Sequence, residues 1–237
     1  MEGAAAYSEG FYADRRTRTV YAARAIFAAL PDSIPRDLVA DVGCGTGTWL
    51  AVALETGSHQ AFGFEGDWVR RDMLDDPRIA FSPRDLELPC AGPRVDLAIS
   101  LEVAEHLSPA RAEPFIAELT AMAPAVLFSA AIPGQGGVGH RNEQWHSHWA
   151  EKFAAHGFGA FDIIRPQIWT DRAIPPWYRQ NTILYLAPDL AAASGLSPTM
   201  PGLLDRVHPD FWNRANRELD YAGALPESVY LDLNRRS

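Results

Sequence analysis

Short apolar runs alternate with longer amphipathic stretches along most of this chain. The runs are brief and bounded by Gly, Pro or Asp, which is typical of buried β-strands, and they lie at residues 38–43, 60–64, 78–82, 95–100, 125–129, 161–164 and 182–186. Between them, apolar residues recur at helical spacing, which predicts helices over residues 17–30, 48–56, 108–122 and 147–157. The alternation predicts an α/β fold with a doubly wound, mostly parallel seven-stranded sheet and helices on both faces.

The two ends of the chain depart from this alternation. Residues 165–181 show no helical pattern, so the last two strands could instead form an antiparallel pair. Beyond Pro188, prolines interrupt short polar pieces, and residues 189–237 are expected to be an extension packed on the main domain, residues 36–188, or on a partner such as a second copy of the chain. Residues 1–35 are expected to form a helical lid.

Composition narrows the class of protein. The chain has 237 residues, of which 47% are hydrophobic, enough for one large core. Its two cysteines, Cys44 and Cys90, match neither a disulfide framework nor a zinc motif, which favours a reducing cytoplasm. The net charge of -9 makes nucleic acid an unlikely partner, because phosphate contacts need a basic face. No apolar stretch reaches the roughly 20 residues that cross a bilayer, so no membrane association is expected.

A glycine-rich loop follows the first predicted strand in the string DVGCGTGTW. Its glycines, Gly43, Gly45 and Gly47, let the backbone turn tightly and approach a nucleotide-like ligand. The dinucleotide fingerprint would need a further glycine where Thr48 stands. Asp41 would repel a pyrophosphate but suits a ligand that carries an amino or sulfonium cation, so the loop favours S-adenosylmethionine.

The same string resembles the first motif of class I S-adenosylmethionine-dependent methyltransferases, which have a Rossmann-like fold. The resemblance covers roughly residues 36–188 and implies that Glu65, after the second strand, binds the ribose hydroxyls. It implies that Asp85 and Leu86, after the third strand, contact the adenine. Each acid has an ordinary alternative as a turn cap or a solvated strand end. Their combined order behind this glycine loop favours the methyltransferase interpretation.

The loop after the fourth strand, SLEVAEHLSP, contains Glu102, Glu105 and His106. On one helical turn these side chains would share a face, where they could hold Mg²⁺ or Mn²⁺. A metal there would acidify a bound hydroxyl. The run resembles those of ubiquinone-pathway O-methyltransferases and of enzymes that methylate the 3′-terminal ribose of small RNAs, where it is associated with a divalent metal. The alternative is that Glu105 or His106 merely caps the next helix.

The loop after the fifth strand is rich in glycine and histidine, which suggests an active-site lid. Its blocks GHRNEQW and, further on, WYRQN resemble a group of bacterial small-molecule methyltransferases. His140 and Glu143 are candidates for a general base or a further metal ligand, alongside His106 as a catalytic residue; His146 and His148 carry less weight. The alternative is that Glu143 caps the following helix.

These motifs support an enzyme that methylates an oxygen of a small-molecule acceptor. One alternative is metal-dependent methylation of an RNA 3′-terminal ribose, which the acidic charge disfavours. A different class is a non-catalytic protein that binds the cofactor as a partner subunit.

Overall fold

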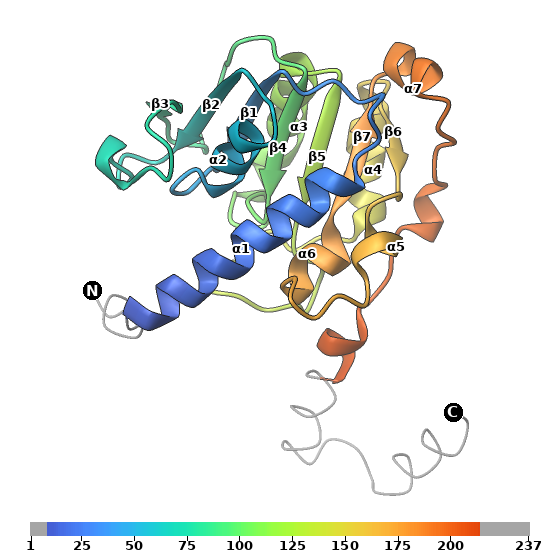
Figure 1. Ribbon diagram of the computed structural model, residues 1–237. Coiled ribbons are helices and arrows are strands. Elements are labelled where there is room, and N and C mark those ends of the chain that lie inside the picture. Colours follow the sequence, from blue (N-terminus) through green and yellow to red (C-terminus); the bar gives the residue numbers. More distant parts are fainter. Residues whose placement is uncertain (1–8, 214–237) are drawn as a thin grey trace, which may run out of the picture.

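A single mixed sheet forms the centre of the computed structural model, which describes residues 9–213, with side chains from Arg16 onward (Figure 1). Within these residues the sheet has seven strands in the order β3-β2-β1-β4-β5-β7-β6. Their bounds are β1 Leu38–Val42, β2 Gln60–Glu65, β3 Ala80–Pro83, β4 Leu97–Leu101, β5 Ala125–Ser129, β6 Gly159–Phe161 and β7 Ile183–Leu186. Strands β1 to β5 are parallel, and β7 runs antiparallel to β5 and β6. The predicted fold class is confirmed.

Helices cover both faces of this sheet. The α-helices are α1 Glu9–Ala29, α2 Thr48–Glu55, α3 Ala112–Met122, α4 His146–Ala155, α5 Arg165–Ile168, α6 Pro176–Asn181 and α7 Pro188–Ser194. Three 3₁₀ turns are η1 Arg71–Met73, η2 Pro109–Arg111 and η3 Pro201–Leu203. Among the described residues, no helix is both long and apolar enough to span a bilayer.

Two sequence predictions about the last part of the sheet are wrong. Residues 165–181 are not irregular, since α5 and α6 lie there, each with a proline in its first turn. Helices this short complete too few turns to show a hydrophobic period. Strand β6 also spans Gly159–Phe161, so it begins and ends earlier than the predicted strand at residues 161–164. The antiparallel arrangement that the sequence left open is the one observed for β6 and β7.

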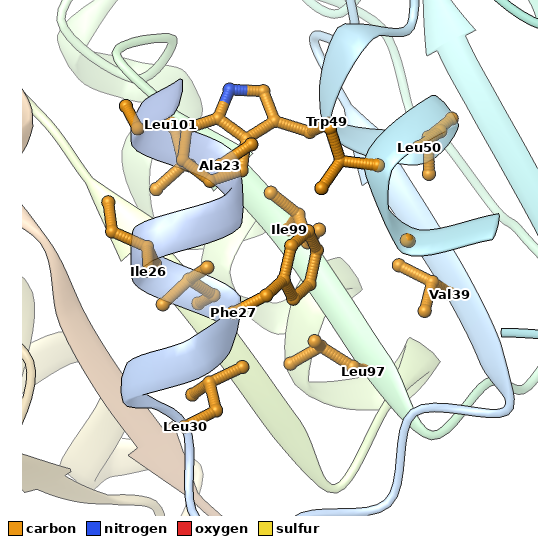
Figure 2. Packing of buried hydrophobic residues seen from close by; sticks show 14 of the residues in the cluster. Ala23, Ile26, Phe27, Leu30, Val39, Trp49, Leu50, Leu97, Ile99 and Leu101 are labelled. Atoms are coloured by element: carbon orange, nitrogen blue, oxygen red, sulfur yellow. The ribbon is translucent and has the colours of Figure 1, made fainter. Parts of the chain in front are cut away.

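Alternating side chains of the buried strands build two cores. Leu97, Ile99 and Leu101 of β4 face α1 and α2, where Figure 2 shows them opposite Phe27 and Trp49. The intervening Ala98 belongs to the core on the other face, which α3 and α4 cover with residues such as Phe115, Trp149 and Phe153. Because β4 is buried on both faces, its sequence is a continuous apolar run.

The order of the strands places the glycine loop beside the loop after β4. Strands β1 and β4 are neighbours, with Asp41 opposite Ile99. From β1 the chain adds β2 and β3 on one side, and from β4 it adds β5 on the other, so the strand order switches direction between β1 and β4. Loops at the carboxyl ends of strands on either side of such a switch point form the usual ligand crevice of this architecture. Gly43 shows how close the loops are: a Cβ there would stand 2.3 Å from Cγ2 of Val103.

The core on the α1 side should dominate the stability of the fold. Ile99→Ala is expected to lower the free energy of unfolding by about 2–5 kcal/mol, because it removes a fully buried side chain and leaves a cavity. Met200→Ala, at a side chain 71% exposed, should change it by less than about 0.5 kcal/mol. Urea denaturation followed by circular dichroism would measure both. Equal effects of the two substitutions would contradict this description of the core.

Candidate active site

One cavity lies over the carboxyl ends of β1, β2 and β3 and gathers residues of the predicted cofactor site. This cavity, called here the cofactor cavity, has a volume of about 390 Å³ and is lined by Gly43, Glu65, Asp85 and Leu86. Glu102 and His106, which the sequence analysis offered as metal ligands, also line it. The sequence analysis assigned no role to the other lining residues, which are Trp68, Glu87, Val103, Leu107 and Arg141. The segments that follow five successive strands, β1 to β5, therefore converge on one cavity of a size suited to a small ligand.

Glu65 is held by the glycine loop that it faces. Its Oε2 accepts the N–H of Gly45 at 3.0 Å, and its Oε1 accepts the N–H of Gly66 at 2.9 Å. Gly43, Gly45 and Gly47 all have positive φ, and Gly47 precedes the first residue of α2 rather than lining the cavity. The carboxylate of Glu65 thus sits at the mouth of the cavity in one fixed orientation.

Asp85 combines two of the roles considered for it. Its Oδ1 accepts the N–H of Glu87 at 3.0 Å, so it caps a turn, and its side chain also lines the cofactor cavity. The buried guanidinium of Arg111 fixes this turn from behind by donating to the carbonyls of Leu86 at 2.8 Å and Leu88 at 3.0 Å. The turn is therefore rigid on the side that faces the cavity.

Asp41 lies beneath the glycine loop and is only 2% exposed. No described residue donates a hydrogen bond to its Oδ2. Burial raises the pKa of this carboxyl well above its ordinary value, and the charge of Glu65 adds to the effect. An unsatisfied buried oxygen of this kind is costly, although Asp41 itself is not among the residues that line the cofactor cavity.

A second cavity of about 550 Å³, the acceptor cavity, adjoins the first. Its walls come from distant parts of the chain: Arg18 of α1, the loop after β4, the loop after β5, the start of α6 and the segment around Phe211. Glu102 and His106 line both cavities. Ligands bound in the two cavities would therefore both lie next to these two side chains.

The turn after β4 differs from the helical turn on which the predicted metal site depended. Glu102 has a φ of +57°, a left-handed conformation that is unusual for a residue other than glycine. Its carboxylate accepts hydrogen bonds from Asn181 Nδ2 at 3.0 Å and Gln135 Nε2 at 3.1 Å. Glu102 therefore lies outside the cluster of potential ligands, in which atoms of Glu105, His106 and His140 lie within 4.8 Å of one another. The predicted trio of Glu102, Glu105 and His106 is corrected to this set.

A buried network of amide side chains surrounds Glu102. Gln180 Nε2 donates to Gln135 Oε1 at 3.0 Å, and Asn181 Nδ2 donates to the same oxygen at 2.9 Å. The backbone N–H of His208 donates to Gln180 Oε1 at 2.8 Å. Gln135, Gln180 and Asn181 are all less than a tenth exposed. The sequence analysis missed their role, although the string WYRQN contains Gln180 and Asn181 and the glycine-rich loop contains Gln135.

His140 and Glu143 form a second polar unit within the loop after β5. The two oxygens of Glu143 accept the N–H groups of Gly134 at 2.8 Å and Gly136 at 3.0 Å, and Oε1 also lies 2.8 Å from His140 Nδ1. Because both oxygens act as acceptors, Nδ1 of His140 is the donor and Nε2 is left as the basic nitrogen. Glu143 orients His140 and does not cap α4, for which Trp145 holds the capping position.

The other two histidines of this loop do not line either cavity. His146 is buried, and its Nε2 contacts Asn181 Oδ1 at 3.1 Å. His148 packs edge-on against Trp149 at 5.4 Å. His106 stands 4.8 Å from His140, ring centre to ring centre, and its pKa is lowered by burial and by that neighbouring imidazole.

Part of the expected C-terminal extension belongs to the site. Leu204 is fully buried in the core beneath α4, and Asp205 accepts hydrogen bonds from Ser147. Asp210 and Phe211 line the acceptor cavity, with Asp210 held by Arg179 at 2.6 Å. Residues 214–237 of that extension, and residues 1–8 of the expected lid, lie outside the described residues.

Glu105 is the most unusual titratable group of the site. It is fully buried, and neither of its carboxyl oxygens has a hydrogen-bond partner among the described residues. Burial, with the nearby charge of Glu102, raises the pKa of Glu105 to about 9. At neutral pH Glu105 is therefore a neutral acid.

This shift has a consequence for stability. The unfolded carboxyl releases its proton near pH 4.5, whereas the folded one keeps it to about pH 9, so the contribution of Glu105 to stability is lost as the pH rises through that window. Relative to wild type, Glu105→Gln should gain about 1 kcal/mol or more between about pH 5 and about pH 8. Urea titrations with EDTA present would measure this gain. A difference between variant and wild type that does not change with pH would show that Glu105 ionises normally.

No protein-family model and no curated protein matches the sequence. Solved structures do match. Human N-acetylserotonin methyltransferase in complex with SAM superimposes with a TM-score of 0.52 at 16% identity, over 76% of this chain and 56% of that one. Magnesium protoporphyrin IX methyltransferase from Synechocystis PCC 6803 with bound SAH gives a TM-score of 0.53 at 17% identity, over 78% and 90% of the two chains.

An O-methyltransferase family protein from Burkholderia thailandensis gives a TM-score of 0.52 at 13% identity, over 73% of this chain and 57% of that one. The chain thus spans little more than half the length of the first and third of these proteins. The fold is the Rossmann-like fold of S-adenosylmethionine-dependent methyltransferases.

Proposed function

We propose that this chain is an S-adenosylmethionine-dependent methyltransferase that transfers the methyl group to an oxygen of a small molecule. The observation that carries the proposal is the meeting of two cavities at Glu102 and His106. One cavity is lined by Gly43, Glu65, Asp85 and Leu86, four of the seven residues assigned to the cofactor, and the other is large enough for a metabolite. Methyl transfer needs the two reactants in line and in contact, which adjoining cavities provide.

The residues present fit the cofactor. Gly43 lets the backbone pass directly against Val103. Glu65 would offer its carboxylate to the ribose hydroxyls, and Asp85 and Leu86, which line the same cavity, would contact the adenine. The unsatisfied Oδ2 of Asp41 suits a nearby cationic or N–H group. S-adenosylmethionine, when bound, supplies an electrophilic methyl group.

His140 is the proposed general base. A hydroxyl at neutral pH keeps its proton, so it becomes a good nucleophile only when a base removes that proton during the transfer. Glu143 fixes the imidazole through Nδ1, which leaves Nε2 to take the hydroxyl proton. A neutral amine needs no such base before it attacks, and this favours oxygen as the methylated atom.

Cofactor binding is the first test. Glu65→Ala should weaken adenosylhomocysteine binding by about 1.5–3 kcal/mol, because it removes hydrogen bonds to a charged group, and Asp85→Ala should also weaken it. Calorimetric titration would measure both. Glu55→Gln, which changes only an exposed ion pair with Arg24, should leave binding unchanged. Tighter binding of ADP than of adenosylhomocysteine would contradict the assignment.

The second test separates a base from a metal. Glu105, His106 and His140 offer one carboxylate and two imidazoles, a donor set that Mg²⁺ disfavours and that Mn²⁺ or Zn²⁺ accepts more readily. With His140 as the base, His140→Ala should lower kcat by about 10²–10⁴, and EDTA should have no effect. His148→Ala, outside both cavities, is the matched control. Loss of activity in EDTA with recovery in Mn²⁺ would replace the base with a metal-activated hydroxyl.

Label transfer from methyl-labelled cofactor to cell-extract fractions tests the acceptor class. Label that appears only in RNA would favour the 3′-terminal ribose alternative, which a single lining cation, Arg18, supports poorly because phosphate contacts need several basic groups. Binding of adenosylhomocysteine with no transfer to any fraction would favour a non-catalytic partner subunit. A cytoplasmic location and self-association through residues 189–237 stay predictions.

A further inference from the structure

One arginine stands in the acceptor cavity without a partner. Arg18 of α1 lines this cavity and is half-buried. Among the described residues, none forms a hydrogen bond or an ion pair with its guanidinium. The other arginines nearby on α1 are paired: Arg16 with Asp75 at 2.8 Å and Arg24 with Glu55 at 2.8 Å. A partly desolvated cation without a counter-charge is unfavourable, so this position is suited to an anion from outside the chain.

The basic and acidic side chains that line the acceptor cavity come from different elements of the fold. Arg18 is the sole arginine or lysine among the described residues that line it, and it belongs to a helix on one face of the sheet. Glu102 and Glu105 come from the loop after β4, together with the imidazoles of His106 and His140. The remaining carboxylate, Asp210, already has Arg179 as its partner. The cavity therefore presents a cation from the helix side and hydrogen-bonding groups from the sheet side.

Apart from Gln135, the rest of the cavity wall has no polar side chain. Pro175, Pro176, Trp177 and Phe211 lie along it, from α6, the residue before it and the C-terminal segment. Prolines and aromatic rings pack well against a flat, unsaturated body, and they exclude water from an ion pair beside them. The cavity thus combines an apolar wall with polar groups of opposite character.

We infer that the methyl acceptor is a small carboxylic acid with a hydroxyl at a distance from the acid, bound through its carboxylate by Arg18. This inference rests on the proposed function. A guanidinium is planar and binds a carboxylate through two parallel N–H bonds, which fixes orientation as well as affinity. With the acid held on the α1 side, the hydroxyl of such a molecule is directed toward His140 and the cofactor cavity.

A single arginine favours a carboxylate over a phosphate. One guanidinium neutralises one negative charge, whereas a phosphate monoester carries nearly two at neutral pH. The second charge would have no counter-charge, because Arg18 is the sole arginine or lysine among the described residues that line the cavity. The site is therefore matched to a monoanion.

The test compares two probes of equal shape on protein saturated with adenosylhomocysteine. Calorimetry should show 3-phenylpropionate binding at least about tenfold more tightly than 3-phenylpropionamide, because a charge-assisted pair replaces a neutral one. Arg18→Gln should abolish this difference. Arg24→Gln, on the same helix but paired with Glu55, should preserve it. Phenyl phosphate should bind more weakly than 3-phenylpropionate.

Titration with adenosylhomocysteine alone, done first on every variant, separates the two proposals. If wild type fails to bind it, the proposed function fails. If all variants bind it equally but the acid and the amide bind alike, or neither binds, the carboxylate inference is overturned while the proposed function stands. Preference for phenyl phosphate that depends on Arg18 would overturn the carboxylate in favour of a phosphorylated acceptor.

Discussion

The carboxylate of Glu102 is the point at which the functional parts of this molecule are joined. It follows the central strand β4 in a left-handed backbone conformation, and amide groups from the loop after β5 and from α6 hold both of its oxygens. A strained residue of this kind persists only when its surroundings fix it more firmly than its own backbone requires. Because Glu102 lines both cavities, the same hydrogen bonds that hold it also set the geometry where the two ligands would meet.

The contrast between Glu102 and Glu105 shows how burial and hydrogen bonding divide two neighbouring acids. Burial raises the pKa of both, but donors from Asn181, Ser129 and Gln135 oppose the shift at Glu102, whereas Glu105 has no side-chain donor and lies beside a like charge. Two acids three residues apart are therefore both buried but differ in the hydrogen bonds that act on them.

The sequence alone contained most of the fold and the cofactor side of the site. The positions of the strands other than β6, the glycine loop, Glu65 and Asp85 follow from local patterns, because a buried strand, the turn after it and the helix beyond it are neighbours in the chain. Residues 165–181 were misinterpreted because α5 and α6 are too short for periodicity to appear. The helical turn expected at Glu102 does not form, because this residue has a positive φ that no sequence pattern predicted.

Tertiary structure alone decided the acceptor side. Arg18, Gln135, Trp177 and Phe211 lie far apart in the sequence and come together only because α1, α6 and the C-terminal segment pack around the ends of β4 and β5. The partners of Glu102 were equally out of reach, since Asn181 is 79 residues away along the chain. The sequence by itself determined the glycine loop and the acids that line the cofactor cavity, because these motifs are short. Long-range packing determined the shape and lining of the acceptor cavity, because the side chains around a cavity come from several segments and not from any one of them.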